Sequence, residues 1–73
     1  MRKTFYKKKE FKTHIILAKI INDNGAFKGF RYENGKWVEW RYILEELFED
    51  RGFDDITKEE AKEIMKGLDN NDL

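Results

Sequence analysis

The chain has 73 residues, with 15 basic and 15 acidic side chains and therefore no formal net charge. It contains no cysteine, which excludes disulfides, thiol catalysis and cysteine-based zinc sites and fits a cytoplasmic location. One small domain is expected from this length, with too small a core for a deep catalytic cleft. No apolar run approaches the roughly 20 residues that span a bilayer, so no membrane partner is expected.

The two halves of the chain have opposite charge. Residues 1–42 hold 11 Lys/Arg against 4 Asp/Glu (+7), whereas residues 43–73 hold 4 against 11 (−7). Such asymmetry is a recognised hint of nucleic-acid or membrane contact by the basic part. The alternative is that the two halves attract each other across the fold.

Residues 1–12 form a predicted basic N-terminal arm with six basic residues and one acid. Its centre is Lys7, Lys8 and Lys9, and aromatic residues are interleaved on both sides. A basic run with aromatic residues can grip phosphates and stack on bases. Two other interpretations stay open, a solvated and poorly ordered chain end or an edge strand over residues 4–6.

Residues 13–68 are predicted to form a single small α+β domain, followed by a polar tail over residues 69–73. Two acidic-Asn-Gly motifs, at 23–25 and 33–35, lie between β-prone runs. Asn-Gly is the strongest short-range signal for a β-hairpin, because both residues accept the positive φ of tight turns. The sequence therefore predicts a three-stranded antiparallel β-meander, although the apolar run 13–21 is also compatible with a helix.

The register of this meander depends on the length of its loops. Two-residue loops would place Tyr32 opposite Trp37 and give a face of mixed character. Three-residue loops, with glycine in a G1 bulge, pair Phe30 with Val38 and gather apolar residues on one face. We expect the three-residue loops, because they give a half-buried sheet of period two. That face then carries His14, Ile16, Ala18, Ile20, Phe30, Tyr32, Val38 and Trp40.

Two amphipathic helices are expected after the sheet. The first covers residues 41–51, with Gly52 as its left-handed C′ residue and Phe53 folded back on Phe48. The second begins at Thr57, the N-cap of a capping box with Glu60. The apolar stripes are Ile43, Leu44, Leu47 and Phe48 in the first helix and Ala61, Ile64, Met65 and Leu68 in the second. The expected fold class is α+β, with both helices packed on one face of the meander.

The other face of the predicted sheet has little to cover it. Under three-residue loops, Leu17, Phe27 and Trp37 lie on that face, with charged residues at the rim. An uncovered apolar face of this kind is typical of a protein interface or a homodimer contact. The alternative is that the N-terminal arm folds over it.

No catalytic or metal site is recognisable, so neither an enzyme nor a cofactor is expected. His14 is the only histidine, and it has no second metal ligand or triad partner. Gly29 and Gly35 lack the spacing and the hydroxyl of a phosphate-binding loop. The acidic residues at 54–60 are explained by the helix N-terminus that they flank.

One local resemblance concerns the second predicted hairpin. Gly29-Phe30-Arg31 followed by Gly35-Lys36-Trp37-Val38 resembles the strands of plant AP2-type and phage-integrase arm-binding domains. Those domains present arginine and tryptophan to DNA from a three-stranded sheet. The resemblance covers residues 29–38 and implies a sheet surface that contacts nucleic acid.

The expected function is that of a small non-enzymatic binding module. The residues expected to bind nucleic acid are Lys7, Lys8, Lys9, Arg31, Lys36, Trp37 and Arg41. The alternative is a protein-binding inhibitor or adaptor of the kind that phages and mobile elements encode. It would dock through Leu17, Phe27 and Trp37, or its acidic helices would mimic nucleic acid.

Overall fold

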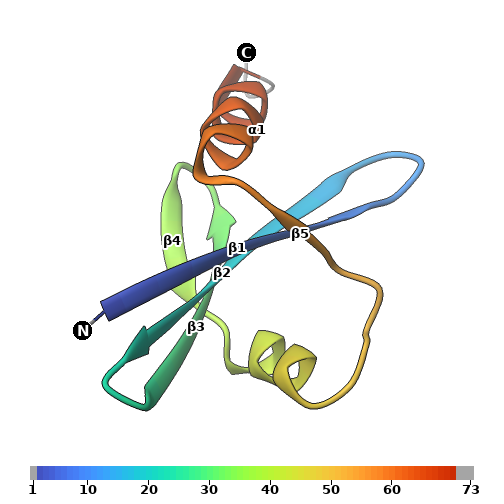
Figure 1. Ribbon diagram of the computed structural model, residues 1–73. Coiled ribbons are helices and arrows are strands. Elements are labelled where there is room, and N and C mark those ends of the chain that lie inside the picture. The colour runs from blue at the N-terminus through green and yellow to red at the C-terminus, as the bar shows by residue number, and fades with distance from the viewer. Residues whose placement is uncertain (1, 71–73) are drawn as a thin grey trace.

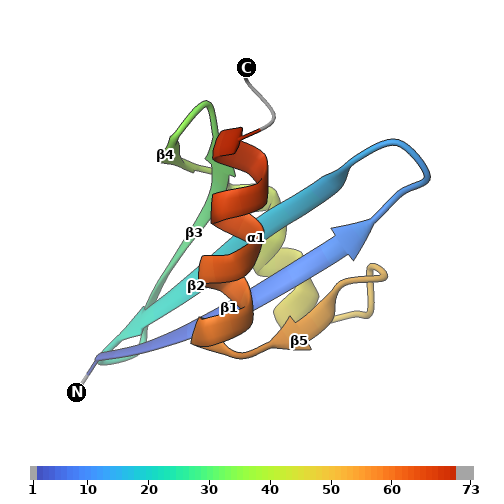
Figure 2. The same ribbon diagram turned by 90° about the horizontal axis from the view of Figure 1, so that it is seen from above.

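The computed structural model describes residues 2–70, which form one antiparallel sheet of five strands in the order β4-β3-β2-β1-β5 (Figure 1). A short 3-10 helix, η1, covers one face of the sheet, and α1 crosses the other (Figure 2). The elements are β1 (Arg2–Glu10), β2 (Ile15–Asp23), β3 (Ala26–Glu33), β4 (Lys36–Glu39), η1 (Arg41–Leu47), β5 (Asp54–Ile56) and α1 (Lys58–Asn70).

The prediction of three strands with two helices on one face is therefore wrong. The basic segment at the N-terminus is β1, which pairs with β2 along its whole length and with β5 on its other side. Backbone N–H and C=O groups at an open strand edge need partners, and β1 supplies them to β2. The apolar run 13–21 contributes β2 and is strand rather than helix.

Both Asn-Gly turns are two-residue loops, so the predicted register is wrong by one residue. Asn34 and Gly35 have φ of 53° and 80°, and Asn24 and Gly25 have φ of 55° and 92°. Two successive positive φ values are those of a type I′ turn, whose twist matches that of the flanking strands. Tyr32 accordingly pairs with Trp37. The even-numbered residues of β3 thus share a face with the odd-numbered residues of β2.

The core on the η1 side is built around Ala18, Ile20 and Ile43, none of which is exposed to solvent. Trp40, Leu44 and Phe53 pack around these three residues. Gly29 brings η1 close to the sheet, because its carbonyl oxygen accepts a hydrogen bond of 2.7 Å from the Trp40 amide. The chain therefore leaves β4 and turns directly over β3.

The first predicted helix is shorter than its apolar stripe suggests. Beyond residue 47 the chain is held by carboxylates, since Glu46 accepts hydrogen bonds from the amides of Arg51 and Phe53. Phe48 is 87% exposed, and Phe53 packs on Trp40, so the expected contact between Phe53 and Phe48 is wrong. The helix ends early because the chain must return to pair β5 with β1.

The second predicted helix begins where the capping box places it. The Thr57 hydroxyl accepts a hydrogen bond of 3.1 Å from the Glu60 amide, one of the orphan donors of the first turn. Ala61 of α1 is buried against the sheet. Leu17 and Ile21 of β2 are the buried sheet residues on the same side. Of the predicted tail, Asp69 and Asn70 belong to α1, and residues 71–73 lie outside the described part of the chain.

Gly29→Ala is expected to lower the free energy of unfolding by more than about 2 kcal/mol, because the core has no room for a methyl group there. A Cβ at this position would collide with Ile43 Cγ2 and would lie 2.6 Å from the Trp40 carbonyl oxygen. Denaturant titration measures the loss. The control is Gly67→Ala in α1, where the added Cβ meets nothing within 4 Å and should stabilise by about 0.5–1 kcal/mol. Equal behaviour of both variants would contradict the close packing of η1.

Thr57→Ala should lower the free energy of unfolding by about 1 kcal/mol, because the Glu60 amide loses its acceptor. Thr57→Ser keeps the hydroxyl and is expected to retain most of the stability. Thermal melts of the three proteins compare them directly. Equal midpoints for alanine and serine would show that the cap does not contribute.

Candidate functional site

The three consecutive lysines of β1 lie on opposite faces of the sheet and are all engaged within the fold. Lys7 forms an ion pair of 2.5 Å with Asp55, and Lys8 forms one of 2.8 Å with Glu10. Lys9 donates a hydrogen bond of 3.0 Å to the Arg51 carbonyl. The hydrogen bond with Glu10 raises the pKa of Lys8. Each of the three lysines therefore has a polar partner within the fold.

The other predicted nucleic-acid ligands do not gather on one surface. Arg31 lies on the η1 side, where it pairs with Glu33 at 3.2 Å and stacks over Trp40 at 5.5 Å. Lys36 and Arg41 are exposed and form no ion pair within residues 2–70. Arg31 pairs with Val38 in β4 and shares its face. Trp37 is the neighbour of Val38 along the strand and therefore projects from the opposite face.

The three residues predicted as a protein interface do not share one face, because Phe27 projects from the η1 side whereas Leu17 and Trp37 project from the α1 side. Leu17 is 1% exposed on the side that α1 covers. Phe27 is 42% exposed on the η1 side. It pairs with Asn22, which lies on the same face of β2 as Ala18. The two-residue turns are the reason, because they shift β3 by one position relative to the expected register.

The structure assembles a different group on the α1 side of the sheet, which we call the basic-aromatic surface. Its members are Tyr6, Lys19, Phe30, Tyr32 and Trp37. The Lys19 ammonium lies 4.3 Å from the Trp37 ring centroid and 5.6 Å from that of Phe30. Trp37 meets Tyr32 edge to face at 5.3 Å, and Tyr6 lies 6.3 Å away.

Pairing across four strands brings this surface together. Lys19 in β2 lies between Tyr6 in β1 and Phe30 in β3, and Tyr32 faces Trp37 in β4. Trp37 was the one member of this group predicted as a binding residue, whereas Phe30 and Tyr32 were expected on the buried face of the sheet. The Asn-Gly turns contained the signal, because two-residue loops place Phe30 and Tyr32 on the same face as Lys19.

Lys19 is a half-buried cation without an acidic partner among residues 2–70. Burial lowers its pKa, and the nearby charge of Arg2 lowers it further. Next to it lies a hollow of about 240 Å³, lined by Arg2, Ile21, Asp23, Ala26, Lys28 and Phe30. Two cations and one carboxylate therefore border the apolar floor of this hollow.

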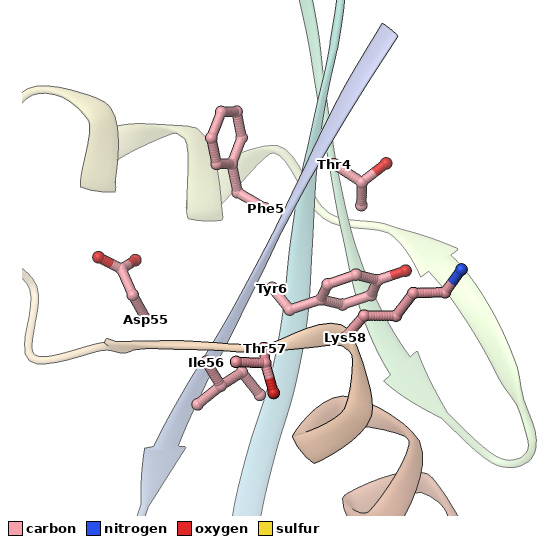
Figure 3. A pocket seen from close by; sticks show the side chains of 7 residues that line it. All are labelled: Thr4, Phe5, Tyr6, Asp55, Ile56, Thr57 and Lys58. Atoms are coloured by element: carbon pink, nitrogen blue, oxygen red, sulfur yellow. The ribbon is translucent and has the colours of Figure 1, made fainter.

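A second hollow, of about 560 Å³, lies between β1, β5 and the start of α1 (Figure 3). It is lined by Thr4, Phe5, Tyr6, Asp55, Ile56, Thr57 and Lys58. These side chains include no nucleophile paired with a base. Within residues 2–70, no group of three His, Cys, Asp or Glu has the geometry to hold a metal ion.

His14 has local partners that account for its position. Its ring stacks on Phe11 at 4.6 Å, and Nδ1 lies 3.1 Å from the Thr13 hydroxyl. The Phe11 amide donates a hydrogen bond of 2.8 Å to the His14 carbonyl. His14 therefore helps to close the connection between β1 and β2.

No family model, curated protein or solved structure matches this chain. The local resemblance to AP2-type and integrase arm-binding strands implies that Arg31 and Trp37 share one face, and here they project from opposite faces. Among residues 2–70, no helix has both the length and the apolar character needed to cross a membrane.

Lys19→Met is expected to change the free energy of unfolding by less than about 1 kcal/mol, because the lost cation–π attraction is offset by relief of burial and of Arg2 repulsion. Lys19→Ala should be more destabilising, since it also removes the stem that covers Trp37. Denaturant titration at pH 7 compares them.

The pH dependence provides a further check on Lys19. Its pKa in the folded protein lies below the ordinary value of 10.5. Wild-type stability attributable to Lys19 should therefore rise as the pH increases from the lowered folded-state pKa towards 10.5, because only the unfolded chain still binds the proton there. Lys19→Met should lack this rise. A large loss of stability in Lys19→Met at pH 7 would mark the residue as structural.

Proposed function

We propose that the protein is a non-enzymatic module that binds single-stranded nucleic acid on the basic-aromatic surface. The main support is the position of the Lys19 ammonium, which lies over Trp37 and Phe30 and has no acidic partner among the described residues. Positive charge beside stacked aromatic rings is the combination that single-strand binders use. Arg2 and Lys28 extend the charge along the same face of the sheet.

Binding requires that a base replace the Lys19 ammonium on the Trp37 ring. The cation–π attraction at an exposed site is about 0.5–1 kcal/mol, whereas stacking of one base contributes about 1–3 kcal/mol. Stacking of a base on Trp37 is therefore more favourable than the cation–π contact that it replaces. The flexible lysine stem then lets the ammonium move to a phosphate of the same strand.

The shape of the site favours a single strand over a duplex. The basic-aromatic surface belongs to the sheet itself, and α1 stands on the same face (Figure 2). The hydroxyl of Tyr32 donates a hydrogen bond of 2.8 Å to Asp69 of α1, so an acidic group marks the boundary on that side. Bases in a duplex present no free π-face to such a surface, whereas unstacked bases do.

The phosphate contacts expected from Lys7, Lys8 and Lys9 are assigned instead to Lys19, Arg2 and Lys28. The three lysines are occupied within the fold, whereas Lys19, Arg2 and Lys28 face the aromatic rings or the hollow beside them. Three phosphate contacts on a single strand give a log-log salt slope of about −2. We expect weak, strongly salt-dependent binding.

Fluorescence anisotropy with a labelled oligothymidine at low salt tests the proposal. Trp37→Leu should weaken binding by roughly 1–3 kcal/mol with the salt slope retained, because stacking releases no counterions. Lys19→Met should reduce the magnitude of the slope by about 0.7. A labelled duplex should bind more weakly than the single strand.

The matched control is Lys62→Met, which removes a lysine from the exposed surface of α1. It should leave both affinity and slope close to those of the wild type. Absence of binding at about 100 micromolar protein and low salt would contradict the proposal, because even non-specific nucleic-acid binders reach that affinity. Equal losses in Lys19→Met and Lys62→Met would show that general charge, not this surface, is responsible.

A further inference from the structure

The N-terminal half of β1 has a strand on only one side. β1 pairs with β2 at all nine of its residues, but β5 pairs only with Tyr6, Lys7 and Lys8. Residues 2–5 therefore have no strand of the described chain along their outer edge (Figure 2). Backbone groups on that edge lack strand partners, and such an edge is a template for another chain.

The edge is open because β5 is cut short by α1. Thr57 would lie opposite Phe5 if β5 continued, but it is the N-cap residue of α1 and directs the chain away from β1. The hollow of about 560 Å³ occupies the space that is left (Figure 3). Phe5, which is 43% exposed, and Ile56 supply apolar surface beside it. An added strand would continue the line of β5.

The positive charge of this edge favours an acidic chain over a second copy of the protein. Arg2 and Lys3 are exposed on the strand, and Lys58 lines the hollow beside it. The acid of the hollow, Asp55, is already paired with Lys7. A second copy would bring four cations together across a four-residue pairing, which like-charge repulsion opposes. An acidic chain meets the same edge with attraction.

We propose that the free edge of β1 at residues 2–5 is a docking site for an acidic, extended peptide segment of another protein. The peptide adds as an outer strand through main-chain hydrogen bonds, which supply affinity whatever its sequence. Side chains alternate between the two faces of the sheet, as Phe5 and Tyr6 do on β1 (Figure 3). An apolar residue opposite Phe5 and carboxylates near Arg2 and Lys3 complete the match.

Nuclear magnetic resonance titration of the labelled protein tests this docking site. The probe is an acetylated and amidated hexapeptide, Val-Val-Glu-Glu-Val-Glu, which in antiparallel register places its first valine opposite Phe5 and its first two glutamates opposite Lys3 and Arg2. It should shift the amide signals of residues 2–5 and slow the hydrogen exchange of those amides that point to the outer edge, because the added strand covers them. Signals from the surface of α1 should stay unchanged.

Two altered peptides separate backbone pairing from charge attraction. Lysine in place of glutamate should weaken binding by about tenfold or more, because it meets Arg2 and Lys3 with like charge. N-methylation of one central valine and the adjacent glutamate blocks a donor on each edge of the peptide and should also weaken binding by about tenfold. Equal binding of the methylated and unmethylated peptides would overturn the proposal.

Variants of the protein complete the test and keep it separate from nucleic-acid binding. Lys3→Glu should weaken binding of the valine-glutamate peptide by about fivefold or more, whereas Lys66→Glu on the exposed surface of α1 should not. Lys3 projects to the η1 side, so its replacement leaves the basic-aromatic surface in place. Lys19→Met should in turn bind the peptide like the wild type.

Two further outcomes would overturn the docking proposal. The first is a peptide-induced shift confined to residues other than 2–5, which would place the contact elsewhere. The second is a dimer in solution that protects the same amides without any peptide, which would assign the edge to a second copy of the chain. Size-exclusion chromatography of the free protein distinguishes the dimer from the monomer.

Discussion

The register fixed by the two Asn-Gly turns is the constraint on which the rest of the structure depends. Each turn uses two residues with positive φ, and side chains alternate strictly along a strand. A shift of one residue would therefore exchange the two faces of β3. With the observed register, Gly29 meets η1 on one face, while Phe30 meets Lys19 on the other.

The opposite charges of the two halves have a simple structural counterpart. The basic half forms β1 to β4, and the acidic half supplies most of η1, β5 and α1, which border this sheet on both faces and one edge. Among residues 2–70, Lys7 and Asp55 form the one ion pair between the halves. Most surface pairs contribute little to stability, so the halves are joined mainly by apolar packing and strand pairing.

The two proposed binding sites use parts of the sheet that the acidic half leaves uncovered. The basic-aromatic surface lies on one face, beside α1, and the docking edge lies where β5 ends. Both use polar groups that have no acidic or strand partner among residues 2–70, namely the Lys19 ammonium and the outer backbone groups of residues 2–5. A half-buried charge is costly to stability unless a partner satisfies it, and an exposed strand edge is open to pairing with another chain, which are physical reasons to look for function there.

The sequence by itself determined the local elements of this protein. Asn-Gly dictated two tight turns, β-branched residues dictated β2, and the Thr57 hydroxyl with Glu60 dictated the start of α1. These outcomes depend on neighbours in the chain, so they are readable from it. The length of each turn was readable too, but the apolar pattern of one face favoured the wrong choice.

Tertiary structure decided what depends on distant partners. β1 became a strand because β2 and β5 offered it hydrogen bonds, although its run of lysines resembles a solvated arm. η1 stopped early because the chain had to return to β1. The basic-aromatic surface joins residues from four strands. Sequence showed the aromatic and basic residues, but only strand pairing could determine which of them share a face.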